Sequence, residues 1–271
     1  MASGAERPDL TETVALAKAG DRAALEALLG AVAPSVHRFG LRMCRNAHDA
    51  EDVVQDTLLA VARHLGEFEG RSSLSSWVFA LTRSACARKR RGLANKPPVS
   101  DTHLVEEPDP SASPEAQASE RELSKALGAA LDALSPDHRE VLVLRDLEGL
   151  TAPEAASVLG ISVDALKSRL HRAREALREA LRPVLEPALA PHAGCPDVVA
   201  LWSQKLEGDL SQADCSAMEA HLAGCPSCGS ACDALKRALL ACQRAPSAAV
   251  PPAVQERVRA AMRAWATESG G

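Results

Sequence analysis

The sequence contains no tyrosine, and aromatic residues make up only 2% of its 271 residues. With so few large rings, the interior has to be built from small and aliphatic side chains, mainly alanine and leucine, which favours packing of helix on helix. Few segments show the β-branched, alternating pattern that is typical of strands. We therefore expect an all-α fold.

Other absences exclude whole classes of protein. No stretch approaches the roughly 18 consecutive apolar residues of a membrane-spanning helix, and the first ten residues lack the basic and apolar segments of a signal peptide. We therefore expect a soluble, cytoplasmic protein without a membrane partner. The sequence shows no nucleophile paired with a base, no glycine-rich phosphate loop and no isolated carboxylate pair, so we do not expect an enzyme. A net charge of −5 excludes an evenly basic coat but not local DNA-binding clusters.

Proline and cysteine divide the chain. Five prolines among Ser, Asp and Glu predict an exposed, flexible linker, because such a composition cannot bury a core. Further prolines at 183, 187 and 191 are expected to end the helical pattern that follows. The predicted parts are a helical block (9–95), the linker (96–119), a second helical block (120–183), a cysteine-rich block (192–243) and a C-terminal tail (244–271). Within the tail, Val254, Val258, Ala261, Met262 and Trp265 share one side of a predicted amphipathic helix.

The first block contains an amphipathic helix with an acidic side and, after it, a helix with a basic end. Taken alone, the acidic side is typical of an ordinary solvated face. The four cations at the end of the next helix either complement the helix macrodipole or neutralise phosphates. A lone Trp at helical spacing, such as Trp77, more often packs in a core than contacts a ligand. The acidic-side residues are Asp49, Glu51, Asp52, Gln55 and Asp56, and the cations are Arg88, Lys89, Arg90 and Arg91.

The order of these elements carries more information than each alone. The run DAEDVVQDTLLAVARHLGEFEGRSSLSSWVFALTRSACARKRR resembles region 2 of the extracytoplasmic-function (ECF) sigma factors. The resemblance implies that the acidic residues face RNA polymerase, and that a loop and helix melt the −10 promoter element and hold the exposed strand. It places Arg71, Ser72, Ser73 and Trp77 near that strand, and Arg83 and Arg88 to Arg91 along the DNA backbone. Ser84 departs from the family's usual Asn.

The second block predicts a helix-turn-helix. Thr151 and Glu154 form a capping box, Gly160 suits a left-handed helix end, and Ser162 caps the next helix. That helix is expected to expose six basic residues: Lys167, Arg169, His171, Arg172, Arg174 and Arg178. Such a face favours contact with phosphates and bases. The predicted DNA contacts are Ser162, Asp164, Lys167, Ser168, Arg169 and Arg172. The segment closely resembles region 4 of the same family, which implies recognition of the −35 element, although Ala165 replaces the usual Thr.

Six of the eight cysteines lie in the third block. His221, Cys225 and Cys228 form a His-x3-Cys-x2-Cys motif at a predicted helix junction, and Cys195 can complete a tetrahedral site. The predicted metal ligands are Cys195, Cys215, His221, Cys225, Cys228, Cys232 and Cys242. Thiolate-rich sites favour soft or borderline ions, with zinc or cadmium first and copper second. Cys44 and Cys86, which stand alone in the first block, are better explained as small buried hydrophobic residues.

The cysteine-rich block resembles the zinc-binding anti-sigma domain, here fused to the sigma-like part as in the CorE-like sigma factors. The resemblance implies a transcription-initiation factor that binds core RNA polymerase and the −10 and −35 promoter elements, is switched by metal, and needs no separate anti-sigma factor. Two alternatives remain. In the first, the protein is a sigma factor whose tail is a structural zinc site or a thiol redox switch. In the second, the protein is a helix-turn-helix repressor that does not bind polymerase.

Overall fold

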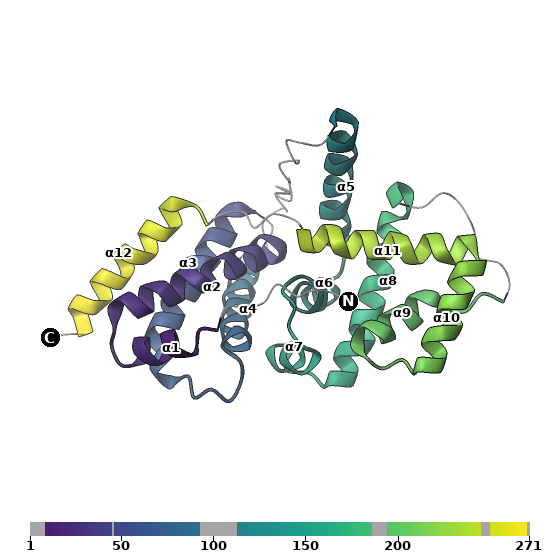
Figure 1. The fold of residues 1–271 in the computed structure, drawn as a ribbon. Coiled ribbons are helices and arrows are strands. Elements are labelled where there is room, and N and C mark those ends of the chain that lie inside the picture. The colour runs from purple at the N-terminus through teal and green to yellow at the C-terminus, as the bar shows by residue number, and fades with distance from the viewer. Residues whose placement is uncertain (1–8, 45, 93–112, 186–193, 245–249, 270–271) are drawn as a thin grey trace. The chain divides into compact units, whose positions relative to one another are not determined.

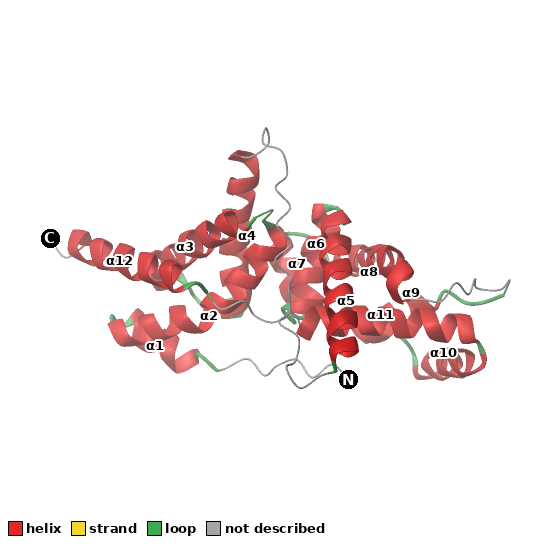
Figure 2. Cartoon of the chain, turned by 90° about the horizontal axis from the view of Figure 1, so that it is seen from above, coloured by secondary structure: helices red, strands yellow, loops and turns green. Residues whose placement is uncertain are grey.

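The computed structural model describes residues 9–44, 46–92, 113–185, 194–244 and 250–269. Every regular element in these ranges is helical, as Figure 2 shows, which confirms the all-α prediction. The helices form two compact units. Within the described ranges, no helix is both long enough and apolar enough to cross a membrane.

The first unit is a helical bundle from the N-terminal part of the chain, joined by the last helix. It contains α1 (Thr11–Lys18), α2 (Arg22–Met43), α3 (Ala47–His64), the 3-10 turn η1 (Leu65–Glu67), α4 (Leu74–Gly92) and α12 (Pro252–Ser269). Helices α2, α3 and α4 pack on one another, and α1 packs on α2. Their contact positions recur at helical spacing, so that Val36, Val54 and Val61 are completely buried.

The second unit is organised around one long helix. It contains α5 (Pro114–Ala133), α6 (Pro136–Leu142), the π-helical turn η2 (Val143–Leu147), α7 (Ala152–Leu159), α8 (Val163–Leu185), α9 (Val198–Glu207), α10 (Gln212–Gly224) and α11 (Pro226–Arg244); residues Ser157–Leu159 group with the first unit. Helices α5, α6, α9 and α11 all contact α8 (Figure 1). The inner stripe of α8 is fully buried at Leu166, Leu170 and Leu177.

Two predicted boundaries need correction. Helix α5 begins at Pro114, inside the segment 96–119 that was predicted as linker. Proline fits the first turn of a helix, where its missing N–H costs no hydrogen bond. Helix α8 continues through Pro183 to Leu185, because a proline close to a helix end disturbs only the final turn. Pro187 and Pro191 lie outside the described residues.

The predicted amphipathic helix of the tail is present as α12, which runs beside α3 (Figure 1). Val254, Val258 and Met262 are buried, as their spacing predicts, and Ala261 is half-buried. The side chain of Trp265 lies outside the described part of the chain. The core partners of α12 are residues of the first block rather than the cysteine-rich block that precedes it in the sequence.

Candidate metal centre and nucleic-acid interfaces

Four of the seven predicted metal ligands come together at one place. The Sγ atoms of Cys195, Cys225 and Cys228 and a ring nitrogen of His221 all lie within 4.8 Å of one another. Cys195 precedes α9, His221 is in the last turn of α10, and Cys228 is in the first turn of α11. The junction forms because α10 ends at Gly224 and Pro226 opens α11 directly afterwards, as the sequence predicts.

The four residues fit a tetrahedral thiophilic ion such as zinc. The Sγ atoms of Cys195 and Cys225 are 3.8 Å apart. Two thiolates on one tetrahedral zinc, each about 2.3 Å from it, would be separated by about the same distance. The Nε2 atom of His221 is buried and has no hydrogen-bond partner among the described residues. A buried ring nitrogen without a partner is unfavourable unless it binds something, and a metal ion satisfies it.

The surroundings shift the pKa values of the two thiols in the Cys-x2-Cys pair in opposite directions. The backbone N–H of Cys228 lowers the pKa of the Cys225 thiol by stabilising its thiolate. Burial raises the pKa of Cys228 to about 12. Metal coordination supplies the positive charge that a buried thiolate needs, so this donor set suits a cation.

One glycine allows the close approach of the two helices at this centre. A Cβ atom on Gly229 would lie 3.2 Å from the backbone oxygen of Leu222, which is tighter than ordinary contact. Gly229 is in the first turn of α11 and Leu222 is beside His221 on α10. The absence of a side chain at position 229 therefore lets the two ligand-bearing helix ends meet. No pattern in the sequence predicts this role of Gly229.

The remaining cysteines have other environments. Cys215 and Cys232, which were also predicted to bind metal, do not belong to the four-ligand group. Cys232 is buried on α11, and burial raises its thiol pKa. The side chain of Cys242 lies outside the described residues. Cys44 and Cys86 are buried, as expected, but they do not stand alone, since their Sγ atoms are 3.9 Å apart.

The helix-turn-helix has the predicted caps. The Oγ1 atom of Thr151 accepts from the backbone N–H of Glu154 (3.4 Å), and a carboxylate oxygen of Glu154 accepts from the N–H of Thr151 (2.8 Å). Gly160 has a φ of +67°, the left-handed conformation that ends α7. The Oγ atom of Ser162 accepts from the N–H of Ala165 at the start of α8. The capping-box prediction is therefore confirmed.

The predicted DNA contacts on α8 are mostly accessible. Ser162, Asp164, Ser168 and Arg172 are exposed. Arg169 is partly covered and pairs with Asp137, at 3.6 Å. Lys167 is also partly covered, and its Nζ atom lies 2.6 Å from Oδ1 of Asp209, which follows α9 in the cysteine-rich block. One predicted DNA contact is thus bound to an acidic residue from that block.

Arg174 corrects the predicted basic face of α8, because it is buried rather than exposed. Its side chain is 1% exposed and forms a double hydrogen bond with Asp146, at 2.6 and 2.9 Å. It also donates to Glu207 (3.0 Å) and to the hydroxyl of Ser203 (2.7 Å), both on α9. Burial lowers the pKa of Arg174, but the two carboxylates outweigh that effect and raise it overall. Helical spacing alone does not reveal acidic partners that come from η2 and α9.

The same contact attaches the cysteine-rich block to the helix-turn-helix. The side chain of Glu207 is 3% exposed and also accepts from Nε of Arg145 at 3.0 Å, so that one carboxylate joins two arginines. Ser203 and Glu207 are one turn apart on α9 and both face Arg174. Because each member of this buried group has a partner of opposite charge or a hydrogen bond, the contact fixes how α9 lies on α8.

In the first unit, the predicted polymerase-facing residues do not all lie at the surface. Asp49 is only 8% exposed and accepts from the side-chain amide of Asn46, at 2.7 Å, at the start of α3. Little of its surface is therefore open to a partner protein in this structure. Glu51, Asp52 and Gln55 are half-buried, and Asp56 is exposed.

The acidic side of α3 pairs with the basic end of α4. Lys89 donates to Asp52 at 2.6 Å, and this hydrogen bond raises the pKa of Lys89. Arg88 lies 3.8 Å from Asp56. The acidic residues that were predicted to face polymerase are therefore in contact with the basic residues that were predicted to lie along the DNA backbone. The side chains of Arg90 and Arg91, in the last turn of α4, lie outside the described residues.

The predicted −10 residues lie in and after the loop before α4. Arg71 is exposed and pairs with Glu69 at 2.8 Å. Ser72 is exposed, and the hydroxyl of Ser73 accepts from the N–H of Ser76 at the start of the helix. Trp77 is half-buried, packs against Phe68 with ring centroids 5.2 Å apart, and adjoins the core. Its packing agrees with the structural alternative considered for a lone Trp.

Three family models match the chain, in the order that the sequence motifs predict. The Sigma-70 region 2 model matches residues 28–95, the Sigma-70 region 4 model matches residues 124–177, and a zinc-finger model matches residues 195–229. The last range contains all four residues of the metal centre.

Sigma factors are among the proteins whose sequences are similar to this chain. The RNA polymerase sigma factor CarQ of Myxococcus xanthus is 36% identical over 158 residues, which cover 58% of this chain and 89% of CarQ. The ECF sigma factor SigE of Mycolicibacterium smegmatis is 32% identical over 173 residues, 62% of this chain and 66% of SigE. SigM of Mycobacterium tuberculosis is 32% identical over 174 residues, 64% of this chain and 84% of SigM.

Two solved structures are also similar. CnrH in complex with the cytosolic domain of CnrY has a TM-score of 0.46 and 25% identity, covering 64% of this chain and 96% of that one. RpoE in complex with the anti-sigma factor NepR from Bartonella quintana has a TM-score of 0.43 and 30% identity, covering 56% and 92%. These comparisons give no support to the expectation that this chain needs no separate anti-sigma factor.

Matches to both sigma regions do not fit the alternative of a helix-turn-helix repressor that never binds polymerase. The chain belongs to the ECF family of RNA polymerase sigma factors, and it carries a zinc-finger domain in the same polypeptide.

Proposed function

We propose that this ECF sigma factor responds directly to a metal ion, which binds at Cys195, His221, Cys225 and Cys228 and changes how strongly the protein binds its promoter. Region 2 would bind core polymerase through Glu51, Asp52, Gln55 and Asp56, and would engage the −10 element through Arg71 and the basic end of α4. Helix α8 would read the −35 element.

The observation that carries this proposal is the ion pair between Lys167 and Asp209. Lys167 is near the start of α8, where a recognition helix enters the major groove. A lysine that is paired with a carboxylate is not free to neutralise a phosphate. The cysteine-rich domain therefore competes with DNA for one contact of the recognition helix.

Helix α9 connects this contact to the metal centre. At its beginning, Val198 packs with Cys225 and Cys228, and Cys195 lies just before it. At its end are Glu207, which binds Arg174, and Asp209, which binds Lys167. The ten residues of α9 span about 15 Å, from the metal ligands to the contact with α8. A change in how Cys195 is held at one end is therefore transmitted to the recognition helix at the other.

Three thiolates and one imidazole favour a borderline or soft ion, which supports zinc or cadmium first and copper second. A metal can shift the protein between states only if it binds them unequally. The proposal is therefore that ion binding and the docking of α9 on α8 are energetically coupled.

The test is run-off transcription with core polymerase on a promoter for this factor, with the protein loaded with zinc, cadmium or copper(I), or stripped by a chelator. We expect transcript yield to differ between loaded and stripped protein, and the difference to disappear in the Cys228→Ser variant. Cys215→Ser is the matched control, because Cys215 lies outside the four-ligand group.

Equal transcript yields from loaded and stripped protein would indicate that the centre is a structural zinc site. A response to peroxide together with no response to metal would instead favour the thiol redox switch. If the protein binds polymerase but no transcript forms under any condition, the promoter that was used is not one that this factor recognises. A failure to bind polymerase would contradict the sigma-factor function itself.

A further inference from the structure

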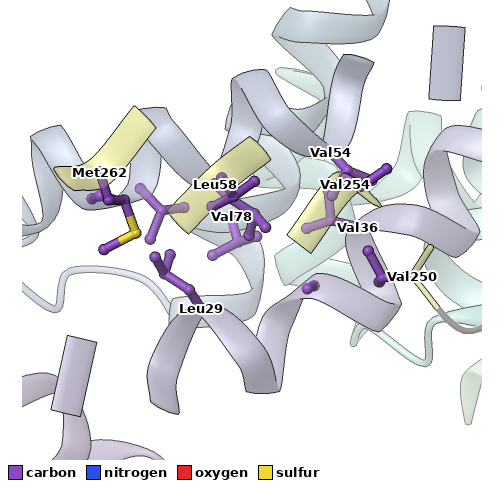
Figure 3. Close-up of a cluster of buried hydrophobic side chains, with 12 residues drawn as sticks. Leu29, Val36, Val54, Leu58, Val78, Val250, Val254 and Met262 are labelled. Carbon is purple, nitrogen blue, oxygen red and sulfur yellow. The ribbon is translucent and has the colours of Figure 1, made fainter. Parts of the chain in front are cut away.

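The last helix of the chain covers part of region 2. Val250, Val254, Val258 and Met262 are all buried, and Val254 is completely so. They join one hydrophobic cluster with residues of α2, α3 and α4. Figure 3 shows Val254 beside Val36 and Val54, and Met262 at the other end of the same cluster. The partners from region 2 are Leu29, Ala33, Val36, Val54, Leu58, Val61, Ala62 and Val78.

The polar side of the contact involves a residue of the proposed polymerase surface. Arg257 of α12 lies 3.1 Å from the carboxylate of Glu51 on α3. Glu51 belongs to the acidic set that region 2 would offer to polymerase. Two further arginines of α12, Arg259 and Arg263, pair with Glu256 of the same helix. The contact with α3 is thus apolar at its centre and complementary in charge at its edge.

The helix depends on this contact for its structure. Most of the stability of a helix in a protein comes from the tertiary packing of its apolar face. The buried valines and Met262 supply the tertiary packing that keeps α12 folded, so release of α12 from region 2 would also unfold it. The state in which α12 covers region 2 and the state in which it is released therefore differ in the hydrogen-exchange protection of the α12 amides, which can be measured.

We propose that α12 is an intramolecular competitor of core RNA polymerase, which occupies the α3 surface of region 2 and has to leave it when polymerase binds. The proposal rests on the polymerase surface proposed above, and it adds a second point of control that is separate from the metal centre. If the covered state is favoured about tenfold, the apparent affinity for core polymerase falls by about the same factor.

The test compares full-length variants in binding to core polymerase and in hydrogen exchange. Val254→Asp places a charge in the buried contact and should release α12, remove its amide protection and strengthen binding to core polymerase by about tenfold. Arg257→Glu opposes Glu51 with a like charge and should strengthen binding by a few fold in the same direction. Arg259→Glu is the control, because Arg259 is exposed and its partner is on its own helix; its affinity should equal that of the unmodified chain.

Two results would overturn the proposal. One is that the α12 amides stay protected in the complex with core polymerase. The other is that α12 is released in Val254→Asp or Arg257→Glu while the affinity for polymerase stays the same or falls. Thermal unfolding separates release of α12 from loss of the whole bundle, and Arg257→Glu leaves the apolar contact intact. If neither the unmodified chain nor any variant binds polymerase, the proposed function is wrong, and this competition with it.

Discussion

The Nζ atom of Lys167 on the recognition helix lies 2.6 Å from Oδ1 of Asp209, in the domain that carries the metal centre. Asp209 directly follows Gly208, whose left-handed conformation (φ +74°) ends α9 and turns the chain. The acid is therefore placed by the end of a helix that begins at the metal ligands. The pair joins the cysteine-rich block to the second helix of the helix-turn-helix.

We predict that Asp209→Asn strengthens binding of the full chain to −35 DNA by about two- to fivefold, because an exposed ion pair of this kind is worth up to about 1 kcal/mol. Fluorescence anisotropy with a labelled −35 duplex measures the change. Glu219→Gln is the matched control, since Glu219 pairs with Lys205 inside the cysteine-rich domain. An equal gain in both variants would indicate a general charge effect rather than release of Lys167.

Lys167→Ala should weaken binding to the same duplex and reduce the slope of log affinity against log salt by about one, because one phosphate contact is lost. Arg174→Ala is not a valid comparison, since Arg174 is buried. Arg178→Ala, on the same helix and more distant from its start, should change the slope less. An unchanged slope in Lys167→Ala would show that this lysine does not contact DNA.

Arg174→Met should lower the free energy of unfolding of the second unit by about 3–5 kcal/mol, because it leaves the carboxylate of Asp146 buried without its cation and removes one of the two arginines that pair with Glu207. Urea unfolding followed by circular dichroism measures this loss. Arg182→Met is the control, since Arg182 forms an exposed pair with Glu179 and should cost less than about 1 kcal/mol. Similar losses in the two variants would contradict the structural importance of the buried group.

The chain should bind one zinc ion at the four-ligand centre. Cys228→Ser should abolish binding, because a tetrahedral site loses one of its four donors. Cys215→Ser and Cys232→Ser should keep the full amount of zinc, since neither residue belongs to that group. Native mass spectrometry of the purified variants measures the stoichiometry. Loss of zinc in Cys232→Ser would show that the site includes a fifth residue.

Gly229→Ala should weaken zinc binding by about fivefold, because a Cβ at this position would lie 3.2 Å from the backbone oxygen of Leu222, so that the two ligand-bearing helix ends have to move apart. Gly224→Ala is a close control on the neighbouring helix end, where a Cβ would meet nothing within 4 Å. Competition with a chromophoric chelator gives both affinities. Equal affinities would mean that α10 and α11 can separate without moving the ligands.

Much of the architecture follows from local sequence. Helical periodicity predicts the helices, and Thr151, Glu154 and Gly160 predict the helix-turn-helix, because capping and left-handed turns depend on residues that are neighbours in the chain. The His-x3-Cys-x2-Cys spacing predicts the junction of α10 and α11 for the same reason. These interactions form within one or two turns, so they can be inferred before the tertiary fold is known.

Tertiary structure alone decided which side chains are buried and with which partners. Arg174 belongs to a basic run in the sequence, yet acids from η2 and α9 bury it. Cys195 joins the metal centre while Cys215 does not, although both are cysteines of the same block. Helix α12 follows the cysteine-rich domain in the chain and packs on α3. The sequence determines which surfaces a helix offers, but its partners come from distant segments, and only the packing of those segments selects among them.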